Sequence, residues 1–467
     1  EVMNSTIMDD LARQGINVNI KAVGIVTEVL VLLLFVWGMA RALYQWLSPK
    51  FGAVSWLGRL LRVDAQPSFG TVGQQESPWR TLLLVSVLTL ASRFLIYGFG
   101  YLVCVNRAVS QGYPSYGFFE SFMNIWNRWD SPHYIDIARD WYLTEAQVTQ
   151  GDSYLFIVFF PLLPLLMRIS GLLVSNPTNA FYFFSGCVIS NIAMCLGCFY
   201  IFRLTQAEYG RRAALWTLVL VLFTPASLFF GICYTEALFL CLCAAFFWYL
   251  RRGRYVAAGL LGALAAFTRS LGVLLVVPFF VEWMDTVVFA GGKKPERGSF
   301  PGCLKKLSGV FIIPAGTLAY LAINLIIYGD CLKFMEYQQH WSQSFSFFAS
   351  NIAGIAQRVF NYNKAISLST WLPELIVIMG TLVLFVLAGG KKMRPSYLAY
   401  IAVYIVVAAA PSWLLSGVRY FAALIPVYML LGRFADKRPA LGALLTALSA
   451  AAMFAYTAGF VCGAHIM

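Results

Sequence analysis

The sequence contains few charged residues. Only 12% of its 467 side chains are Asp, Glu, Lys or Arg, whereas 60% are hydrophobic. Because a soluble globular domain carries about 25% charged residues, this composition excludes an ordinary water-soluble protein. The apolar residues form repeated stretches of roughly 20, each the length of a membrane-crossing helix. We therefore expect an all-α polytopic membrane protein, because a helix satisfies its own backbone hydrogen bonds within the bilayer.

Histidine and paired cysteines are also scarce. The chain has three histidines, His133, His340 and His465, which are too few for a His-rich metal site. No Cys-x-x-Cys pair lies in a polar loop, and the cysteines fall mainly in apolar runs, where they act as small buried hydrophobes. The sequence therefore predicts neither a zinc site nor a disulfide framework, and we expect no cofactor.

The net charge of +13 needs an explanation other than nucleic-acid binding. Such an excess in a soluble protein suggests a nucleic-acid partner. Here the basic residues cluster in short loops beside the apolar stretches, as the positive-inside rule describes. No nucleic-acid-binding module is present, so these loops are interpreted as cytoplasmic topology determinants.

The charges of the loops set an orientation for the apolar stretches. Residues 22–45 form a first span, although it carries Glu28, and the basic loop 46–80 follows it. Because basic loops stay in the cytoplasm, we expect the N-terminus outside. Residues 1–21 lack the basic start of a signal peptide. About twelve spans are expected: 22–45, 81–105, 179–202, 213–231, 234–250, 256–268, 271–285, 308–328, 368–388, 396–411, 419–434 and 440–462.

These spans divide into two parts. Residues 1–79 form an N-terminal extra span with its basic cytoplasmic loop, and residues 80–467 hold the other spans with an outer loop at 106–177. Within that loop, the apolar segment 157–173 is short, has two prolines and carries Arg168. If it crossed the membrane, the basic loop 203–212 would lie outside. An interfacial juxtamembrane helix keeps that loop inside, and we favour this interpretation.

The outer loop contains a polar and aromatic stretch, Arg128–Tyr134, with the sequence RWDSPHY. Asp130 has two interpretations. It either caps the start of a helix, since Asp before Ser-Pro favours capping, or serves as a general base held against aromatic side chains. His133 lies three residues on, on the same helical face, where it can orient a substrate or the carboxylate.

Charged residues also interrupt the apolar runs. Arg269 lies within LAAFTRSLGVLLVV, and an arginine at that depth requires a partner, either Glu236 or an anionic ligand. Arg419 in SGVRY has a similar setting. Two arginines converging on one outer cavity suit a phosphate, and the structural alternative is Arg–Glu pairing. A second outer polar patch runs from Asp330 to Trp341, and its alternative interpretation is a solvated loop.

Six segments between about residues 80 and 465 together resemble one family. They are RWDSPHYIDIA, FFPLLPLL, TPASLFF with YTEALF, FTRSLGVLL, YGDCLKFMEYQQHW and SGVRYFAALIPVYMLL. In this order they are similar to the PIG-V mannosyltransferases, which comprise eukaryotic GPI mannosyltransferase II and prokaryotic relatives within the GT-C glycosyltransferases. The resemblance implies a GT-C-like bundle of about twelve transmembrane helices with a juxtamembrane helical layer in the outer loop.

The resemblance also implies a reaction. A sugar, which the resemblance suggests is mannose, moves from a polyprenyl- or dolichyl-phosphate sugar to a hydroxyl group. The acceptor is a glycolipid, a glycan or a protein, and the anomeric configuration is inverted. Asp130 is implied as the catalytic base, and Arg269 and Arg419 as the cations that neutralise the phosphate, so that no metal is required. The other implied substrate-binding residues are Arg128, Trp129, His133, Tyr134, Glu236, Tyr420, Asp330 and Trp341.

Three motifs depart from the family pattern. The usual Tyr-Ser-Glu is Tyr-Thr-Glu at 234–236, Gly-Asp-Pro is Gly-Asp-Cys at 329–331, and Pro-Arg-Tyr/Phe is Val-Arg-Tyr at 418–420. The first change keeps a hydroxyl beside the carboxylate, and the second loses a proline. These departures leave the identities of the sugar and the acceptor open.

Two other classes of function remain as alternatives. A polyprenyl-phosphate or lipid transporter would use the same arginines to bind phosphate and its broken helices as gates, with charges at the midplane related by an internal repeat. No such repeat is visible, and the charges gather on the outer side, which favours the enzyme. A structural subunit would not need this cluster. We expect the site on the non-cytoplasmic face of a bacterial plasma membrane, since a eukaryotic retention signal is lacking. The ER membrane is the alternative.

Overall fold

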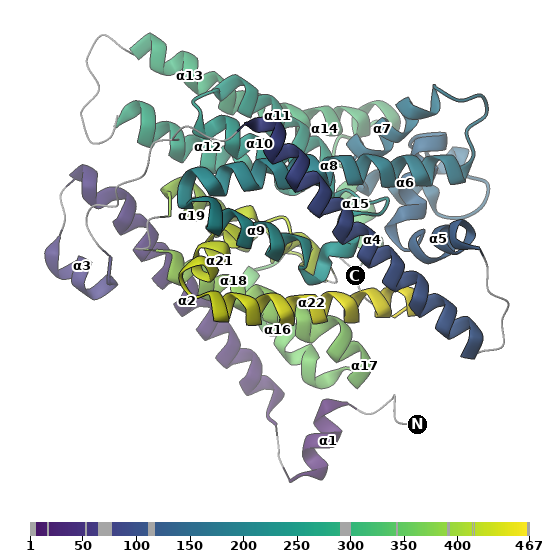
Figure 1. The fold of residues 1–467 in the computed structure, drawn as a ribbon, viewed down its shortest axis with the longest axis horizontal. Helices are drawn as coiled ribbons and strands as arrows, with labels where there is room; N and C mark the ends of the chain where they lie inside the picture. The colour runs from purple at the N-terminus through teal and green to yellow at the C-terminus, as the bar shows by residue number, and fades with distance from the viewer. Residues whose placement is uncertain are drawn as a thin grey trace.

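The chain forms helices joined by short connections (Figure 1). The structure is a computed structural model that describes residues 6–15, 18–51, 54–63, 77–110, 117–289, 300–341, 344–389, 393–412, 414 and 416–464. Within these ranges the β-structure consists of two isolated bridges, one between Thr6 and Asn363 and one between Phe345 and Pro411. The predicted all-α class is therefore confirmed.

Helices follow one another along the whole chain. The first are α1 (Ile7–Arg13), α2 (Ile20–Phe51), α3 (Ser55–Leu61) and α4 (Pro78–Ser110). The outer layer follows, with α5 (Phe118–Trp126), α6 (Asp130–Asp140), η2 (Glu145–Gln147), η3 (Ser153–Val158) and α7 (Leu162–Gly171). Next come α8 (Asn179–Tyr209), α9 (Arg211–Leu222), η4 (Pro225–Phe230), α10 (Glu236–Arg251), α11 (Tyr255–Thr268), η5 (Ser270–Leu275), α12 (Val276–Trp283) and η6 (Met284–Val288). The last are α13 (Phe300–Ile312), α14 (Pro314–Tyr328), α15 (Lys333–Gln338), η8 (Gln339–Trp341), α16 (Phe348–Asn361), α17 (Lys364–Ile366), η9 (Ser367–Trp371), α18 (Leu372–Ala388), α19 (Pro395–Ala408), α20 (Gly417–Phe421), α21 (Ile425–Lys437) and α22 (Pro439–Cys462).

Seven helices in the described part of the chain are long and apolar enough to cross a membrane. They are Ile20–Phe51, Pro78–Ala108, Asn179–Tyr209, Ser270–Val288, Lys306–Tyr328, Lys364–Ala388 and Pro439–Cys462. Each coincides with one of the expected spans, which supports an integral membrane protein.

The other five expected spans correspond to the shorter helices α9, α10, α11, α19 and α21, which have 12 to 16 residues. At about 1.5 Å per residue these helices fall short of the roughly 30 Å hydrocarbon core. They are short because the chain leaves the helical conformation inside the bundle. For example, α11 ends at Arg269, whose backbone is extended (φ −153°, ψ 148°). The expected number of twelve spans is therefore not confirmed.

The segments that were assigned to opposite sides of the membrane lie at opposite ends of the molecule. Figure 1 shows α3 and α13, which flank the basic loops, at one end of the long axis. The helices α5, α6 and α7 of the outer layer lie at the other end. This separation agrees with the alternating topology that the loop charges predict.

The apolar segment 157–173, interpreted above as either a span or an interfacial helix, contains the ten-residue helix α7. Its length is about 15 Å, half of the hydrocarbon thickness, so it is too short to cross alone. Arg168 donates from Nη1 to the carbonyl oxygens of Ala138 (3.1 Å) and Arg139 (2.9 Å), at the end of α6. These contacts hold α7 against the outer layer and favour the interfacial interpretation.

Tyrosine hydroxyls hold the connection between α6 and α7 in place. Tyr328 Oη donates to the carbonyl oxygens of Leu143 (2.7 Å) and Tyr154 (3.0 Å), and Tyr320 Oη donates to Ile157 (2.7 Å). Both tyrosines come from α14, so these bonds fasten an irregular segment to the bundle. Buried carbonyl groups without such partners would be costly.

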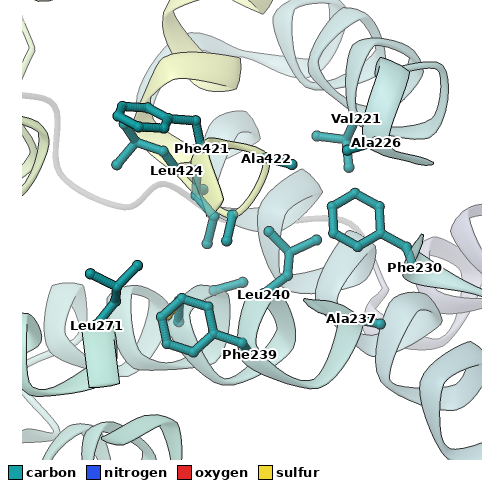
Figure 2. Packing of buried hydrophobic residues seen from close by; sticks show 14 of the residues in the cluster. Val221, Ala226, Phe230, Ala237, Phe239, Leu240, Leu271, Phe421, Ala422 and Leu424 are labelled. Atoms are coloured by element: carbon teal, nitrogen blue, oxygen red, sulfur yellow. The ribbon is translucent and has the colours of Figure 1, made fainter. Parts of the chain in front are cut away.

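The core of the bundle is built around α10, which is buried along nearly its whole length. Figure 2 shows Phe239 and Leu240 of α10 facing Phe421 and Leu424, which come from α20 and the turn after it. A helix that is apolar on all sides belongs in a protein core or a membrane, and α10 is enclosed by the other elements of the core. The start of α10, at Glu236, is therefore fixed firmly in space.

A buried ionic cluster lies at the end of α10 that is opposite Glu236, and it also involves α8, α12 and α19. Arg251 and Arg394 both contact Glu208, at 2.5 and 3.1 Å, and both contact Glu282 at 3.4 Å. Ser396 Oγ donates to Glu282 at 2.6 Å. Each buried charge in this cluster has an opposite charge beside it, as burial in a low dielectric requires. The cluster fixes α8, α10, α12 and α19 relative to one another.

The N-terminal helix α2 packs directly on the rest of the bundle. Gly24 and Gly38 allow close approach, because a Cβ would lie 2.2 Å from Gln357 Nε2 and 2.6 Å from the Phe385 ring, respectively. Ser350 Oγ donates to Glu28 at 2.6 Å, which gives the acid within this expected span a partner. The segment 1–79 thus contributes a helix to the same packed body.

Candidate active site

Four charged residues from four separate elements meet inside the bundle. Asp130 is the first residue of α6, Glu236 is the first residue of α10, Arg269 follows the last residue of α11, and Arg419 lies in the short helix α20. All four were expected from the sequence to belong to the site. We refer to them below as the four-charge cluster.

The contacts within the four-charge cluster form a chain. Arg269 Nη1 lies 2.7 Å from Glu236 Oε1. Arg419 contacts the same oxygen from Nε (2.9 Å) and Nη2 (2.7 Å). Arg419 Nη2 also lies 2.7 Å from Asp130 Oδ2. Of the two partners considered for Arg269, the structure shows Glu236, so the Arg–Glu pairing named as the structural alternative is present. Arg419 extends this pairing to Asp130.

Exposure differs sharply along this chain. The side chains of Glu236 and Arg419 are 1% and 4% exposed, and that of Arg269 is 13% exposed. Asp130 is 25% exposed, the largest fraction of the four. Asp130 is thus the member that an incoming molecule can reach most readily.

The helix ends suit the charges placed on them. Asp130 and Glu236 lie in the first turns of α6 and α10, where the helix dipole favours a negative charge. Arg269 follows the end of α11, where the dipole favours a positive charge. Helix ends at membrane depth are tolerated where they line a polar site.

Aromatic rings cover both guanidinium groups. The guanidinium carbon of Arg419 lies 4.9 Å from the ring centre of Phe229 and 4.8 Å from that of Tyr234. The guanidinium carbon of Arg269 lies 4.8 Å from the ring centre of Tyr420. Cation–π contacts at these distances stabilise arginine in a site with little water. Tyr420 was among the expected site residues, whereas Phe229 and Tyr234 were not. Both lie in segments that carried the resemblance, TPASLFF and YTEALF.

The backbone just before Asp130 has an unusual conformation. Trp129 has φ 56° and ψ −111°, a combination that residues other than glycine rarely adopt. Two donors fix this turn through the carbonyl oxygen of Arg128: Tyr234 Oη at 2.8 Å and the Ser131 amide at 3.2 Å. Strained backbone of this kind occurs preferentially at functional sites.

The capping interpretation of Asp130 is wrong. Helix α6 begins at Asp130 itself, the N-cap position is Trp129, and no side chain caps the helix start. The Asp130 carboxylate instead binds Arg419. A cap requires a side chain that turns back to the amides of its own helix, whereas this one is directed to another element.

The two other candidates on α6 flank the four-charge cluster. Tyr134 is buried, and its hydroxyl lies 3.5 Å from Thr235 Oγ1, which in turn accepts a 3.2 Å hydrogen bond from Arg269. The ring of His133 lies 4.4 Å from Phe156, and its Nδ1 has no hydrogen-bond partner among the described residues. Burial lowers the pKa of His133, although the charges of Asp130 and Asp136 oppose this shift.

Three candidates are not brought into the cluster. Arg128 donates to the carbonyl oxygens of Asn124 and Phe460, both at 3.3 Å, and its place in the site is its backbone carbonyl rather than its guanidinium. Asp330 accepts a 2.9 Å hydrogen bond from the Leu332 amide in an exposed turn. The backbone of Trp341 ends η8, but its side chain lies outside the described residues.

A metal centre was not among the expectations for this site. Among the described residues, no group of three or more His, Cys, Asp or Glu side chains is arranged to hold a metal ion. The four-charge cluster itself contains two carboxylates that are each bound to arginine.

Part of the chain matches a known family. Residues 101–290 match the family described as Mannosyltransferase (PIG-V). This range includes Asp130, Glu236 and Arg269 but not Arg419, and it is less than half of the chain.

Mammalian proteins named GPI alpha-1,6-mannosyltransferase 2 are among the relatives. The rat (Rattus norvegicus) protein is 29% identical over 164 residues, which are 34% of this chain and 31% of that protein. The hamster (Cricetulus griseus) protein is 31% identical over 157 residues, which are 32% of this chain and 30% of that protein. The matched part thus spans about a third of the length of these relatives.

Two solved structures that are distantly similar to this chain are the following. ArnT from Cupriavidus metallidurans, in a crystal structure bound to undecaprenyl phosphate, has a TM-score of 0.45 and 16% identity, covering 75% of this chain and 60% of ArnT. The Archaeoglobus fulgidus oligosaccharyltransferase has a TM-score of 0.44 and 14% identity, covering 82% and 55%.

The sequence matches and the segments that carried the resemblance agree on one family. The motif with Asp130 and the motif with Glu236 both lie within residues 101–290. The predicted resemblance is therefore confirmed, and this integral membrane protein is related through residues 101–290 to the PIG-V mannosyltransferases.

Proposed function

We propose that the protein is a membrane glycosyltransferase that moves mannose from a polyprenyl-phosphate sugar to the hydroxyl of an acceptor. The observation that carries this proposal is the arrangement of Arg419, which binds the partly exposed Asp130 and the buried Glu236 with one nitrogen. The site thus places a carboxylate suited to accept a proton beside a guanidinium suited to bind phosphate.

The proposed reaction is a direct displacement. The acceptor oxygen forms a bond to the anomeric carbon while the bond from that carbon to the phosphate oxygen breaks. The phosphate leaves with the electron pair, Asp130 takes the proton of the hydroxyl, and attack from the face opposite the phosphate inverts the anomeric configuration. Asp130 is suited to this role because it is the most exposed of the four charges.

The phosphate needs a cation that is free to bind it. In the structure the two arginines and the two acids of the four-charge cluster balance to a net charge of zero. Binding of a donor phosphate is therefore most favourable if the phosphate replaces one carboxylate as the partner of an arginine. Glu236 is held by two arginines and is 1% exposed, whereas Asp130 is held by Arg419 and is 25% exposed.

We therefore assign the exchange to Asp130. The donor phosphate displaces Asp130 from Arg419, and the released carboxylate then accepts the proton of the acceptor hydroxyl. In this scheme Arg269 and Arg419 stabilise the second negative charge that the phosphate gains as it leaves. The scheme uses no metal or other cofactor. Aromatic side chains such as Trp129 and Tyr134 are proposed to contact the sugar.

The location of the site follows from the loop charges. Because the basic loops are assigned to the cytoplasm, the proposed site opens on the non-cytoplasmic face of the membrane. A bacterial plasma membrane is the favoured location, and the ER membrane is the alternative. The acceptor is proposed to be a glycolipid, a glycan or a protein.

One assay tests the proposal. Purified protein is incubated with polyprenyl-phosphate mannose, and separately with polyprenyl-phosphate glucose, together with a membrane glycolipid extract. Mass spectrometry then follows release of polyprenyl phosphate and the gain of one hexose by an acceptor. Release of the lipid phosphate with hexose gain supports the enzyme. Binding of the lipid without turnover, together with its movement across liposome bilayers, would instead support a transporter.

A further inference from the structure

Another buried acid, Glu374, contacts the helix that carries Arg419. Glu374 is in α18, within the candidate span Lys364–Ala388, and its side chain is completely buried. An ionisable residue within a membrane span is costly, so its presence calls for a specific role. Neither the sequence motifs nor the proposed reaction assigns one to Glu374.

Glu374 binds the backbone of the helix that carries Arg419. Its Oε1 accepts a 2.9 Å hydrogen bond from the amide of Gly417, the first residue of α20. Two residues later, Arg419 makes its contacts with Glu236 and Asp130. The amides at the start of a helix lack partners within the helix, so this carboxylate satisfies a buried donor.

The carboxylate lies directly against the backbone at this position. A Cβ added to Gly417 would lie 3.1 Å from Glu374 Oε2 and 3.1 Å from Leu414 Cδ2. Contacts under 3.4 Å are tighter than most real Cβ contacts, so glycine is what lets the carboxylate approach. Glu374 Oε2 has no hydrogen-bond partner among the described residues.

A second contact holds the other side of Arg419. Tyr404 Oη donates a 2.6 Å hydrogen bond to the carbonyl oxygen of Tyr420. Glu374 and Tyr404 therefore hold the backbone on both sides of Arg419. A helix of five residues is too short to be stable by itself, so its position depends on such contacts.

We infer that Glu374 is a positioning residue, which places the Arg419 guanidinium where it can exchange Asp130 for the donor phosphate. The expected effect of Glu374 on kcat/KM rests on the proposed function, whereas its effect on the position of Arg419 does not. Glu374 does not touch the proposed substrate. Its effect passes through Gly417 to Arg419.

Two substitutions separate the hydrogen bond from the charge. Glu374→Gln keeps an oxygen for the Gly417 amide, and we expect kcat/KM for polyprenyl-phosphate mannose within about twofold of wild type. Glu374→Leu leaves the amide without a partner, and we expect kcat/KM per folded molecule to fall about tenfold, with a higher KM for the donor. Equal kcat/KM in the Leu variant and the wild type overturns the inference.

Matched variants control for a general loss of stability. Glu28 also lies in an expected span and accepts a hydrogen bond from Ser350. Glu28→Leu should lower the melting temperature without changing kcat/KM. If Glu374→Leu does not fold, Gly417→Ala replaces it, because the added Cβ requires the carboxylate or Leu414 to shift by a few tenths of an ångström and should raise KM in the same direction. An unchanged KM in a folded Gly417→Ala protein counts against the inference.

A measurement without catalysis distinguishes failure of the inference from failure of the proposed function. Melting temperatures are compared for Glu374→Leu, Arg419→Met and the double variant in detergent. If Glu374 positions Arg419, the Glu374→Leu change lowers the melting temperature less when Arg419 is already replaced. Additive effects overturn the positioning role. Coupling together with a wild-type protein that transfers no sugar would reject the proposed function alone.

Discussion

Arg419 binds Asp130 with a single nitrogen, Nη2, at 2.7 Å, although 289 residues separate them in the chain. The same nitrogen lies 2.7 Å from Glu236. The contact joins the outer layer to the bundle core and gives Arg419 one partly exposed carboxylate, Asp130, and one buried carboxylate, Glu236. This difference between the two acids is the basis of the exchange that we propose.

Removing the charge of Asp130 should strengthen binding of the lipid phosphate. Asp130→Asn removes the carboxylate that competes for Arg419, so we expect the dissociation constant for polyprenyl phosphate to fall by up to about tenfold. Titration followed by tryptophan fluorescence or calorimetry in detergent gives this constant.

The matched control for this titration is Asp136→Asn. Asp136 lies on the same helix and pairs with Arg139 at 3.0 Å, away from Arg419. Its replacement should leave the dissociation constant unchanged. Weaker binding by Asp130→Asn would mean that Asp130 assists phosphate binding rather than competing with it.

Glu236 should be the most important of the four charges for stability. Glu236→Gln leaves two buried arginines without their shared carboxylate, and we expect a loss of about 3–5 kcal/mol in the free energy of unfolding. Denaturant unfolding in detergent, followed by tryptophan fluorescence, measures this loss.

An exposed pair serves as the control for Glu236. Glu336 is 59% exposed and pairs with Lys333 at 2.7 Å. Glu336→Gln should change the free energy of unfolding by less than about 1 kcal/mol, because exposed ion pairs contribute little. A Glu236→Gln protein as stable as this control would contradict the central structural role of Glu236.

Acid should destabilise the protein partly through His133. Burial lowers the pKa of His133 below its ordinary value of 6.5, with Asp130 and Asp136 opposing the shift. The unfolded chain therefore binds the proton more readily, and stability falls as the pH drops below about 6.5. We expect the decrease in melting temperature between pH 7.5 and pH 5.5 to be smaller in His133→Phe than in wild type. An equal decrease in both proteins would exclude His133 from the response.

Chelation of divalent metals should leave sugar transfer unchanged. In our scheme Arg269 and Arg419 provide the positive charge that the leaving phosphate needs. We therefore expect equal initial rates with and without EDTA in the assay with polyprenyl-phosphate mannose. Loss of transfer in EDTA, with recovery on adding Mg²⁺ or Mn²⁺, would require a metal in the mechanism.

Much of the site could be predicted because charge is so costly within a membrane. Arg269 and Glu236 interrupt apolar runs, and the need of each for a partner made Glu236 one of the two candidate partners of Arg269, the one that the structure shows. The loop charges also predicted the interfacial position of α7, and its length of ten residues favours this.

Other features had no signal in the sequence. The contact between Arg419 and Asp130 joins elements that are 289 positions apart in the chain, and no spacing rule relates them. The expected spans 234–250 and 256–268 agree closely with α10 and α11, but composition does not reveal that the start of α10 and the end of α11 meet at the site. The left-handed backbone at Trp129 is imposed by tertiary contacts, because no local preference of tryptophan favours it.

Glu374 lies between these two cases. As a lone acid in the apolar stretch 364–388 it could have been noticed by the same argument that identified Arg269. Its partner, however, is a backbone amide, and side-chain types in the sequence do not indicate such a bond.

The most direct test of the account is sugar transfer by Asp130→Asn, measured beside wild type and Asp136→Asn. With polyprenyl-phosphate mannose and a glycolipid acceptor, wild type and Asp136→Asn should both transfer hexose. Asp130→Asn should be slower by a factor of about 10²–10⁴, the usual contribution of a general base, while it remains folded and binds the lipid phosphate. Transfer by Asp130→Asn at the wild-type rate would contradict the account.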